Sequence, residues 1–239
     1  MDQPAPIREA YERIREAMFG ACARRRRAPE SVRLLAATKT VAPERIREAY
    51  ACGCRLFGEN RVQERQAKLE ALRGLTEASW HLLGPLQQNK AARALNTFDC
   101  IESLDSLALA ERLSRLAAQP VEVLIEVNIG REPQKHGVLP EAALELGLAI
   151  HAIDRARERL VVSGVMAVPP ATANPEAARP YFAELAELGE RLRQALRHPP
   201  LGWELSMGMS QDYEVAIEEG ATLVRLGTAL FGARGLGAR

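Results

Sequence analysis

One lysine of this chain stands where the sequence predicts the end of a buried strand. Residues 34–39 read LLAATK, and such a short apolar run is typical of a strand that is buried on both faces. The chain has 32 basic residues but only four lysines. An amine with a tunable pKa can form a Schiff base, whereas a guanidinium cannot. Lys39 is therefore a candidate for covalent chemistry, and the alternative is a loop lysine that reaches solvent.

Two loops rich in glycine and hydroxyl groups follow the last two predicted strands. They are residues 206–210, which read SMGMS, and the pair Gly227 and Thr228. In α/β barrels the loops after strands seven and eight often bind phosphate, because glycines let backbone N–H groups approach an anion. Alone, Ser210 is an ordinary helix cap and Gly227 an ordinary turn residue. Together the two loops predict a phosphate site.

Other polar residues lie at or near the ends of predicted strands. Arg225 ends the eighth strand, where a buried charge needs a partner. It either pairs with a carboxylate such as Glu204 or Glu102, or donates to a bound ring. His81 fits a satisfied polar residue better than a base, because nothing in the sequence fixes its partner. The full set of candidate site residues is Lys39, Asn60, His81, Met166, Ser206, Ser210, Arg225, Gly227 and Thr228.

A lysine amine, a phosphate site and an arginine between them fit pyridoxal 5′-phosphate. The aldehyde would meet Lys39, and the phosphate would meet Ser210, Gly227 and Thr228. The ring nitrogen would face Arg225. Since arginine only donates hydrogen bonds, that nitrogen would be an unprotonated acceptor, which weakens the ring as an electron sink.

The elements that must position these residues alternate regularly along the chain. A leading helix is predicted over about residues 5–24. Strict alternation of strands and helices then indicates a parallel sheet, and eight units in 239 residues indicate a closed barrel. An open doubly wound sheet would need a glycine-rich turn after the first strand, and residues 38–41 are not one. The predicted strands are residues 33–38, 55–57, 80–83, 99–102, 121–127, 160–167, 203–205 and 222–225.

We therefore expect an α/β fold with one (β/α)8 TIM-type barrel and an extra N-terminal helix. The whole of residues 1–239 is expected to be a single domain, with the barrel over about 30–232. Asn60 is expected to cap a helix that runs to about Leu72, with Gln63 as its capping-box partner. Ser210 is expected to cap a short helix that runs to about Glu219.

Composition limits the class of protein. The net charge of +1 gives no electrostatic footprint for nucleic acid. The four cysteines lack metal-type spacing, so they are expected to be free thiols and no metal site is expected. No signal core and no apolar stretch of membrane-spanning length occur in the sequence. These features predict a soluble cytoplasmic protein that binds neither nucleic acid nor membrane.

Several longer motifs resemble the pyridoxal phosphate homeostasis protein family, whose members are single-domain relatives of the alanine racemase barrel. The resemblance covers about residues 30–232. Its motifs are ATKT at 37–40, FGENRVQE at 57–64, WHLLGPLQQNK at 80–90, VNI at 127–129, KHGV at 135–138, GVM at 164–166, LSMGMSQD at 205–212 and VRLGTALFG at 224–232.

The resemblance implies that pyridoxal phosphate is held covalently, as an internal aldimine on Lys39. It also implies that Asn60 and Met166 line the faces of the ring. The implied role is homeostasis of pyridoxal phosphate (vitamin B6) and of amino and keto acids, without catalytic turnover. Expected partners are pyridoxal phosphate itself, with acceptor apo-enzymes as candidates, and the expected state is a monomer or weak dimer.

Two other functions stay open from the sequence. One is a pyridoxal phosphate-dependent racemase or decarboxylase, and the other is a barrel aldolase that uses Lys39 directly on a sugar phosphate. Racemisation needs an acid and a base on opposite faces of the substrate carbon. In the two-domain racemases that this barrel resembles, a tyrosine of a second domain serves one face. Here all four tyrosines fall in predicted helices, which favours the role without turnover.

Overall fold

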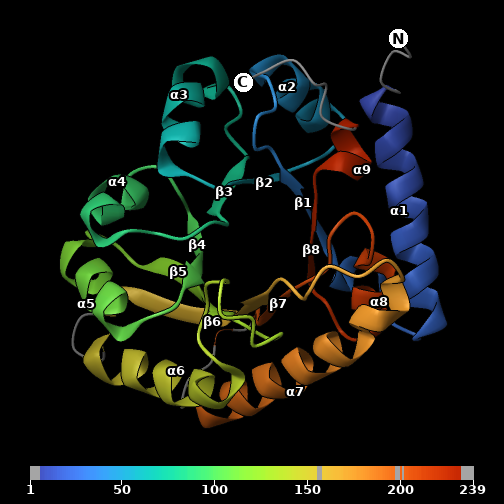
Figure 1. Cartoon of the computed structure of the whole chain (residues 1–239). Coiled ribbons are helices and arrows are strands. Elements are labelled where there is room, and N and C mark those ends of the chain that lie inside the picture. The colour runs from blue at the N-terminus through green and yellow to red at the C-terminus, as the bar shows by residue number, and fades with distance from the viewer. Residues whose placement is uncertain (1–5, 155–157, 197–199, 201, 233–239) are drawn as a thin grey trace.

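The strands form a closed parallel barrel in sequence order, in which the last strand pairs with the first (Figure 1). The computed structural model describes residues 6–154, 158–196, 200 and 202–232. Within them the barrel has eight strands: β1 (Arg33–Ala37), β2 (Leu56–Glu59), β3 (Ser79–Leu82), β4 (Cys100–Leu104), β5 (Val121–Val127), β6 (Leu160–Ala167), β7 (Glu204–Ser206) and β8 (Leu223–Leu226).

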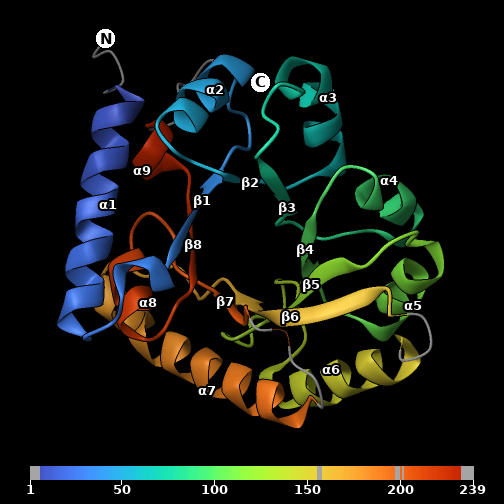
Figure 2. The same cartoon turned by 180° about the vertical axis from the view of Figure 1, so that it is seen from behind.

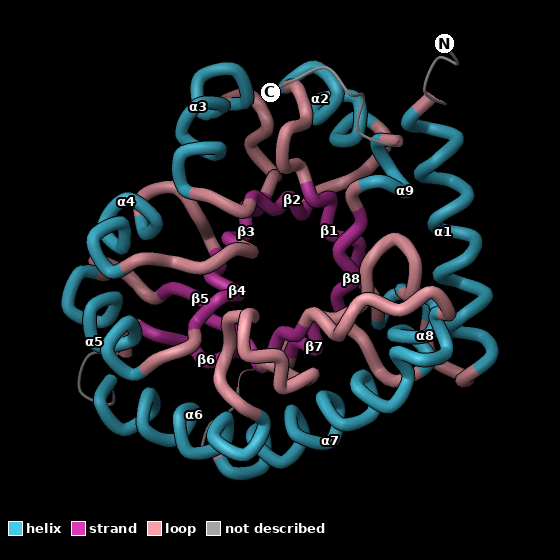
Figure 3. The backbone as a smooth tube through the Cα atoms, in the orientation of Figure 1, coloured by secondary structure: helices cyan, strands magenta, loops and turns pink. Residues whose placement is uncertain are grey.

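Helices surround the barrel on its outside (Figure 3). The α-helices are α1 (Ile7–Arg24), α2 (Pro43–Ala51), α3 (Val62–Leu72), α4 (Ala91–Leu95), α5 (Leu107–Leu116), α6 (Pro140–Asp154), α7 (Arg179–Ala195), α8 (Tyr213–Glu218) and α9 (Thr228–Phe231). Short 3-10 helices are η1 (Pro29–Ser31), η2 (Gln88–Lys90) and η3 (Pro175–Ala178). The leading helix α1 packs against α8 and α9 on the outside of the barrel, next to β1 and β8 (Figure 2).

The main core lies between the strands and the surrounding helices. Side chains such as Phe57 on β2 and Phe182 on α7 are fully buried there. Inside the barrel, Cys100, Leu124 and Met166 form a small separate apolar cluster. The barrel interior is therefore only partly apolar, which leaves room for buried polar side chains.

One glycine sets the contact between β6 and β7. A Cβ added to Gly164 would lie 2.0 Å from the backbone oxygen of Glu204 on the neighbouring strand. No real Cβ is found so close to a carbonyl oxygen, and β6 and β7 are in register at these two residues. Only glycine therefore fits at this position without moving a strand.

The fold-class prediction is confirmed, because the described chain is an α/β barrel with a leading helix. The ends of the predicted domain, residues 1–5 and 233–239, lie outside the described residues. Within the described ranges, no helix is long and apolar enough to cross a membrane.

The predicted cap at Asn60 is wrong. Helix α3 begins at Val62, so Arg61, and not Asn60, holds the N-cap position. The carboxylate of Glu64 accepts hydrogen bonds from the backbone N–H groups of Asn60 (3.1 Å) and Arg61 (3.2 Å). Glu64 therefore satisfies the free donors at the helix start, in the place where Gln63 was expected. Asn60 instead lines the cavity at the carboxyl ends of the strands.

The predicted cap at Ser210 is also wrong. Helix α8 begins at Tyr213, directly after Asp212. Asp212 accepts a hydrogen bond from the backbone N–H of Met209 at 2.6 Å. The Ser210 hydroxyl instead accepts one from the backbone N–H of Ala229 at 3.1 Å. Ser210 thus joins the loop after β7 to the first turn of α9.

Candidate functional site

A cavity of about 780 Å³ opens at the carboxyl ends of the strands. Its wall combines the ends of β1, β2 and β8 with the loops after β6 and β7. This is the end of a β/α barrel at which active sites form, because the connecting loops converge there. Six of the nine predicted residues line this one cavity: Lys39, Asn60, Ser210, Arg225, Gly227 and Thr228.

Lys39 lies two residues beyond the end of β1. Thr38 is buried, whereas Lys39 is exposed to the cavity. Thr40 follows with φ at 63°, a left-handed conformation that turns the chain toward α2. Within the described residues, the Lys39 amine makes no hydrogen bond or ion pair. The amine is therefore available to a ligand in the cavity.

A buried ion pair beside this turn fixes its position. Glu59 at the end of β2 is fully buried, and its carboxylate accepts hydrogen bonds from Lys68 Nζ (2.7 Å) and Thr38 Oγ1 (2.8 Å). Lys68 also donates to the backbone oxygen of Thr38 at 2.9 Å. Burial raises the pKa of Glu59, and the hydrogen bond and charge of Lys68 oppose that shift. Strand β1, strand β2 and helix α3 are thus tied together next to Lys39.

The Glu59–Lys68 pair was not predicted from the sequence, although two features of the sequence indicate it. Glu59 is a charged residue in a strand that is otherwise buried, and Lys68 is one of only four lysines. The nine-residue separation spans a strand end and two turns of α3. A buried carboxylate predicts a nearby cation, and Lys68 is the lysine that follows it on the next helix.

The two loops predicted to bind phosphate lie side by side. Ser210 in the first loop is bonded to Ala229 in the second. Thr228 is the first residue of α9, and Gly227 precedes it. A Cβ on Gly227 would lie 3.3 Å from the backbone oxygen of Ala37, so the second loop passes close to the end of β1. Two hydroxyls and the backbone N–H groups of a helix start therefore border the cavity together.

A chain of buried hydrogen bonds runs beneath the cavity from Arg225 to His81. Arg225 donates from Nη1 to Ser206 Oγ (2.5 Å) and from Nη2 to the backbone oxygen of Ala167 (2.8 Å). Ser206 Oγ donates to Glu102 Oε2 at 2.5 Å. The other oxygen of Glu102 lies 2.7 Å from His81 Nδ1. Since every member has a partner, the network can hold Arg225 in one orientation.

The charge of Arg225 is balanced by Glu102. Nη1 of Arg225 lies 3.9 Å from Glu102 Oε2, whereas Glu204 bonds to Arg33 and Thr222. Of the two carboxylates considered from the sequence, Glu102 is thus the partner. Burial lowers the pKa of Arg225, and Glu102 opposes that shift.

Glu102 is held in its ionised form despite complete burial. Burial alone would raise its pKa, but the hydrogen bond and charge of His81, with Arg225 and Ser206, bring the pKa below its usual value. An ionised carboxylate only accepts hydrogen bonds. Nδ1 of His81 therefore carries the proton in this contact.

Three predicted residues lie below the cavity wall. His81 and Ser206 belong to the buried network, and both are almost completely shielded from solvent. Met166 packs with Cys100 and Leu124 in the small interior cluster. None of the three lines the cavity, so among the described residues they act on a ligand there only through Arg225 and the packing of the barrel interior.

Another interior carboxylate has a displaced pKa. Glu126 on β5 shares a strand face with Leu124, and its Oε2 is buried with no hydrogen-bond partner among the residues that the structure describes. Burial, followed by repulsion from Asp105, raises the pKa of Glu126 to about 7, and Arg225 opposes the shift. Glu126 is therefore a carboxyl group that titrates near neutral pH.

The cavity also has two basic residues that sequence reasoning did not single out. Arg45 on α2 lines it and donates to the backbone oxygen of Phe231 at 3.5 Å. Lys135 lines the opposite part and donates to the backbone oxygen of Pro169 at 3.0 Å. Lys135 also forms an ion pair with Glu132. In contrast to Lys39, its amine is engaged by the protein.

Comparison with known proteins places these features in a family. The alanine racemase N-terminal domain family matches residues 22–235. The pyridoxal phosphate homeostasis protein of Aquifex aeolicus is 45% identical over 233 residues, which cover 95% of this chain and 97% of that protein. PipY of Synechococcus elongatus PCC7942, solved with pyridoxal phosphate bound, is 39% identical with a TM-score of 0.76, and the match covers 90% of this chain and 100% of that one.

A more distant likeness concerns the fold alone. Alanine racemase from Corynebacterium glutamicum is 17% identical with a TM-score of 0.64, and the match covers 97% of this chain but 64% of the racemase. The near-complete match to the Aquifex aeolicus protein is much closer in both sequence and length. The chain therefore belongs to the pyridoxal phosphate homeostasis protein family.

Proposed function

We propose that this protein binds pyridoxal 5′-phosphate in the cavity and serves the homeostasis of that cofactor. One observation carries the proposal: a single cavity joins an unengaged lysine amine, a buried arginine and two loops rich in hydroxyl and N–H donors. The solved relative from Synechococcus elongatus is described with pyridoxal phosphate bound, which supports the same ligand here.

The residues of the cavity fit the three polar parts of this cofactor. The Lys39 amine suits the aldehyde, and bound pyridoxal phosphate supplies an electrophilic carbon that a lysine can hold covalently. Ser210 and Thr228 would donate to the phosphate together with backbone N–H groups near Gly227. Arg225 would donate to the ring nitrogen, since its plane is fixed by bonds to Ser206 and Ala167.

Substitution of Lys39 tests the covalent attachment. Lys39→Ala is expected to abolish the visible absorbance band that develops when pyridoxal phosphate is added to the purified protein. Lys135→Ala is the matched control, because that lysine lines the same cavity but is bonded to Pro169 and Glu132. Its band should persist.

Mass spectrometry gives an independent readout of the same site. After borohydride reduction of the loaded wild-type protein, the added mass is expected on Lys39. A label found on Lys90 or Lys135 alone would show that the assignment is wrong. A bare barrel aldolase that uses Lys39 on a sugar phosphate would develop no visible band with pyridoxal phosphate.

We further propose that the protein does not turn over amino acids. A racemase needs an acid and a base on opposite faces of the substrate carbon, and Lys39 could serve one of them. The tyrosines Tyr11, Tyr50, Tyr181 and Tyr213 lie in α1, α2, α7 and α8, and within the described structure none of them lines the cavity. Arg225 at the ring nitrogen would also weaken the ring as an electron sink.

Exchange of the α-proton of amino acids measures this directly. In deuterated water, the loaded protein is expected to exchange the α-proton of alanine, serine or lysine no faster than free pyridoxal phosphate. A rate of about 1 s⁻¹ or more, typical of enzymes, that is lost in Lys39→Ala would instead favour a racemase or decarboxylase. The same loaded protein tests whether apo-enzymes accept the cofactor. If they do, its visible absorbance band should decline when a pyridoxal phosphate-dependent apo-enzyme is added.

A further inference from the structure

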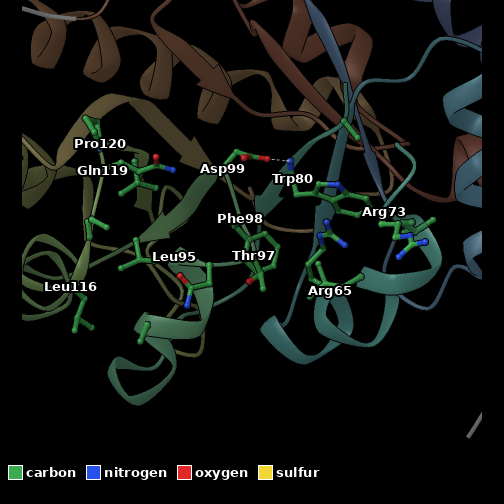
Figure 4. Close-up of a pocket in the computed structure, with 18 of the residues that line it drawn as sticks. Arg65, Arg73, Trp80, Leu95, Thr97, Phe98, Asp99, Leu116, Gln119 and Pro120 are labelled. Carbon is green, nitrogen blue, oxygen red and sulfur yellow. Dashed lines mark hydrogen bonds between the residues drawn. The ribbon is translucent and has the colours of Figure 1, made fainter. Parts of the chain in front are cut away.

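A second cavity lies at the opposite end of the barrel from the proposed cofactor site. It has a volume of about 550 Å³ and is bordered by the ends of α3, α4 and α5 and by the starts of β3, β4 and β5 (Figure 4). It shares no lining residue with the first cavity. Whatever binds there would not compete for the same space.

Arg65 lies against this cavity, and its guanidinium has no hydrogen-bond partner in the described part of the chain. Arg65 on α3 is 9% exposed, and its Nε and Nη1 are buried with no acceptor among the described residues. Its guanidinium stacks over the ring of Trp80 with a distance of 4.0 Å to the ring centre (Figure 4). Stacking on an aromatic ring does not satisfy N–H donors, so the buried cation still lacks an acceptor. A carboxylate in the cavity would supply it.

A carboxylate lies beside Trp80 in the wall of the same cavity (Figure 4). Asp99 is exposed, and one of its oxygens accepts the backbone N–H of Trp80 at 2.8 Å (Figure 4). Burial lowers the pKa of Arg65 and the charge of Asp99 opposes that shift, but within the described part of the chain the two side chains do not form an ion pair. The cavity therefore presents one positive and one negative group that are not neutralised by direct contact.

The rest of the wall is mixed, with exposed leucines beside polar residues such as Asn96, Thr97 and Gln119. Leu69 and Leu116 are 38% and 36% exposed, and both line the cavity. Leu95 and Phe98 also line the cavity (Figure 4). Exposed leucines at a concave surface favour an apolar ligand body.

We propose that this cavity binds an α-amino acid with an apolar side chain. The ligand carboxylate bonds to Arg65, its ammonium group bonds to Asp99, and its side chain packs against the exposed leucines. The two Arg65 nitrogens are closed to solvent in this structure, so binding includes a small movement of the guanidinium, which no hydrogen bond among the described residues opposes. A phosphate dianion fits less well, because Asp99 would repel it and Arg73 is turned to Glu70.

Fluorescence of Trp80 provides the assay. The chain has two tryptophans, so Trp203→Phe leaves Trp80, which stacks on Arg65, as the reporter. The probes are L-leucine, 4-methyl-2-oxopentanoate, which lacks the ammonium group, and 3-methylbutylamine, which lacks the carboxylate. A saturable change with L-leucine is expected, with at least tenfold weaker binding of each truncated analogue, by the usual strength of a charge-assisted hydrogen bond.

Two variants separate the roles of the charges. Arg65→Met keeps most of the aliphatic stem and is expected to weaken L-leucine binding at least tenfold. Asp99→Asn keeps an oxygen for the N–H of Trp80 and is expected to weaken L-leucine but not the oxo acid. Binding of pyridoxal phosphate, read from its visible band, should be unchanged in both, which shows that the variants are folded and keeps the two proposals independent.

Three results would overturn the inference. They are the absence of a saturable change with L-leucine, equal binding by wild type and Arg65→Met, and equal affinity for L-leucine and its oxo acid with no effect of Asp99→Asn. The first two would leave Arg65 as a packing residue on Trp80, and the third would leave a site for organic anions in general. If Arg65→Met does not fold, Asp99→Asn and the analogue series decide the question alone.

Discussion

Removal of the ionisable group at Glu126 should make the protein more stable at neutral and alkaline pH. Glu126 faces the barrel interior, and its Oε2 has no hydrogen-bond partner among the described residues. Burial raises its pKa from 4.5 to about 7. The folded protein therefore holds a proton on Glu126 at a pH where the unfolded chain has lost it. Glu126→Gln keeps the shape of the neutral acid and cannot ionise.

The sign and size of the effect follow from proton linkage. Between about pH 4.5 and 7 the folded state binds more protons at this site than the unfolded state, so stability falls as the pH rises. Each pKa unit corresponds to about 1.4 kcal/mol, which gives an upper limit of about 3 kcal/mol for this shift. Because Glu126 keeps some exposure and screening, we expect about 2 kcal/mol between pH 5 and pH 8.

Urea unfolding of the cofactor-free protein, followed by circular dichroism at several pH values, measures this difference. The free energy of unfolding of Glu126→Gln relative to wild type should rise by about 2 kcal/mol from pH 5 to pH 8. Glu122→Gln is the matched control on the same strand, because residue 122 is exposed. A difference between Glu126→Gln and wild type that does not change with pH would refute the reasoning.

Two further substitutions test the cofactor site and the barrel. Thr228→Val removes one donor to the phosphate and should weaken pyridoxal phosphate roughly tenfold to a hundredfold by absorbance titration, while pyridoxal binds equally; equal losses would place Thr228 away from the phosphate. Gly164→Ala puts a methyl group 2.0 Å from the backbone oxygen of Glu204 and should lower the free energy of unfolding by at least about 3 kcal/mol. Gly74→Ala is the control, because an added Cβ there meets nothing within 4 Å, and its free energy of unfolding should stay within about 1 kcal/mol of wild type. Similar losses of stability in the two variants would contradict the close packing of β6 and β7.

The barrel could be predicted because its pattern is local. Each strand is a short apolar run and each helix an amphipathic stretch, so the order of elements can be read without knowing any long-range contact. The predicted bounds of β5 and β6 agree with the structure at both ends. Alternation then leaves few ways to bury both faces of the sheet. Lys39, Arg225 and Thr228 meet at one cavity because all of them lie at, or just beyond, the carboxyl end of a strand.

The helix starts were harder to predict, because several residues can satisfy the same donors. Asn60 and Ser210 both have side chains that commonly cap helices. In the structure Glu64 bonds to the amides before α3, and Asp212 bonds to Met209 before α8. The local preference for capping a helix does not distinguish such residues. Which of them reaches the free N–H groups depends on the path of the loop between the strand and the helix.

The buried network could not be predicted in detail, because its bonds join residues far apart in sequence. Ser206 and Glu102 are 104 residues apart, and His81 and Glu102 are 21 apart. Which side chains meet inside the barrel depends on the register of every strand pair between them. The sequence indicated that Arg225 either pairs with a carboxylate, such as Glu204 or Glu102, or donates to a bound ring, and it did not choose between the two carboxylates.

The structure shows how the few lysines of this chain differ in their contacts. The inference that lysine is kept where arginine cannot act pointed to Lys39, but the same composition applies to the other three lysines. Lys68 is used for a buried ion pair with Glu59, where a compact ammonium group bonds to two oxygens at 2.7 and 2.9 Å. Lys135 lines the cavity but is bonded by the protein. Lys90 does not line the cavity. Of the two lysines that line it, Lys39 is therefore the one whose amine no described residue engages, at a turn that Lys68 itself helps to fix.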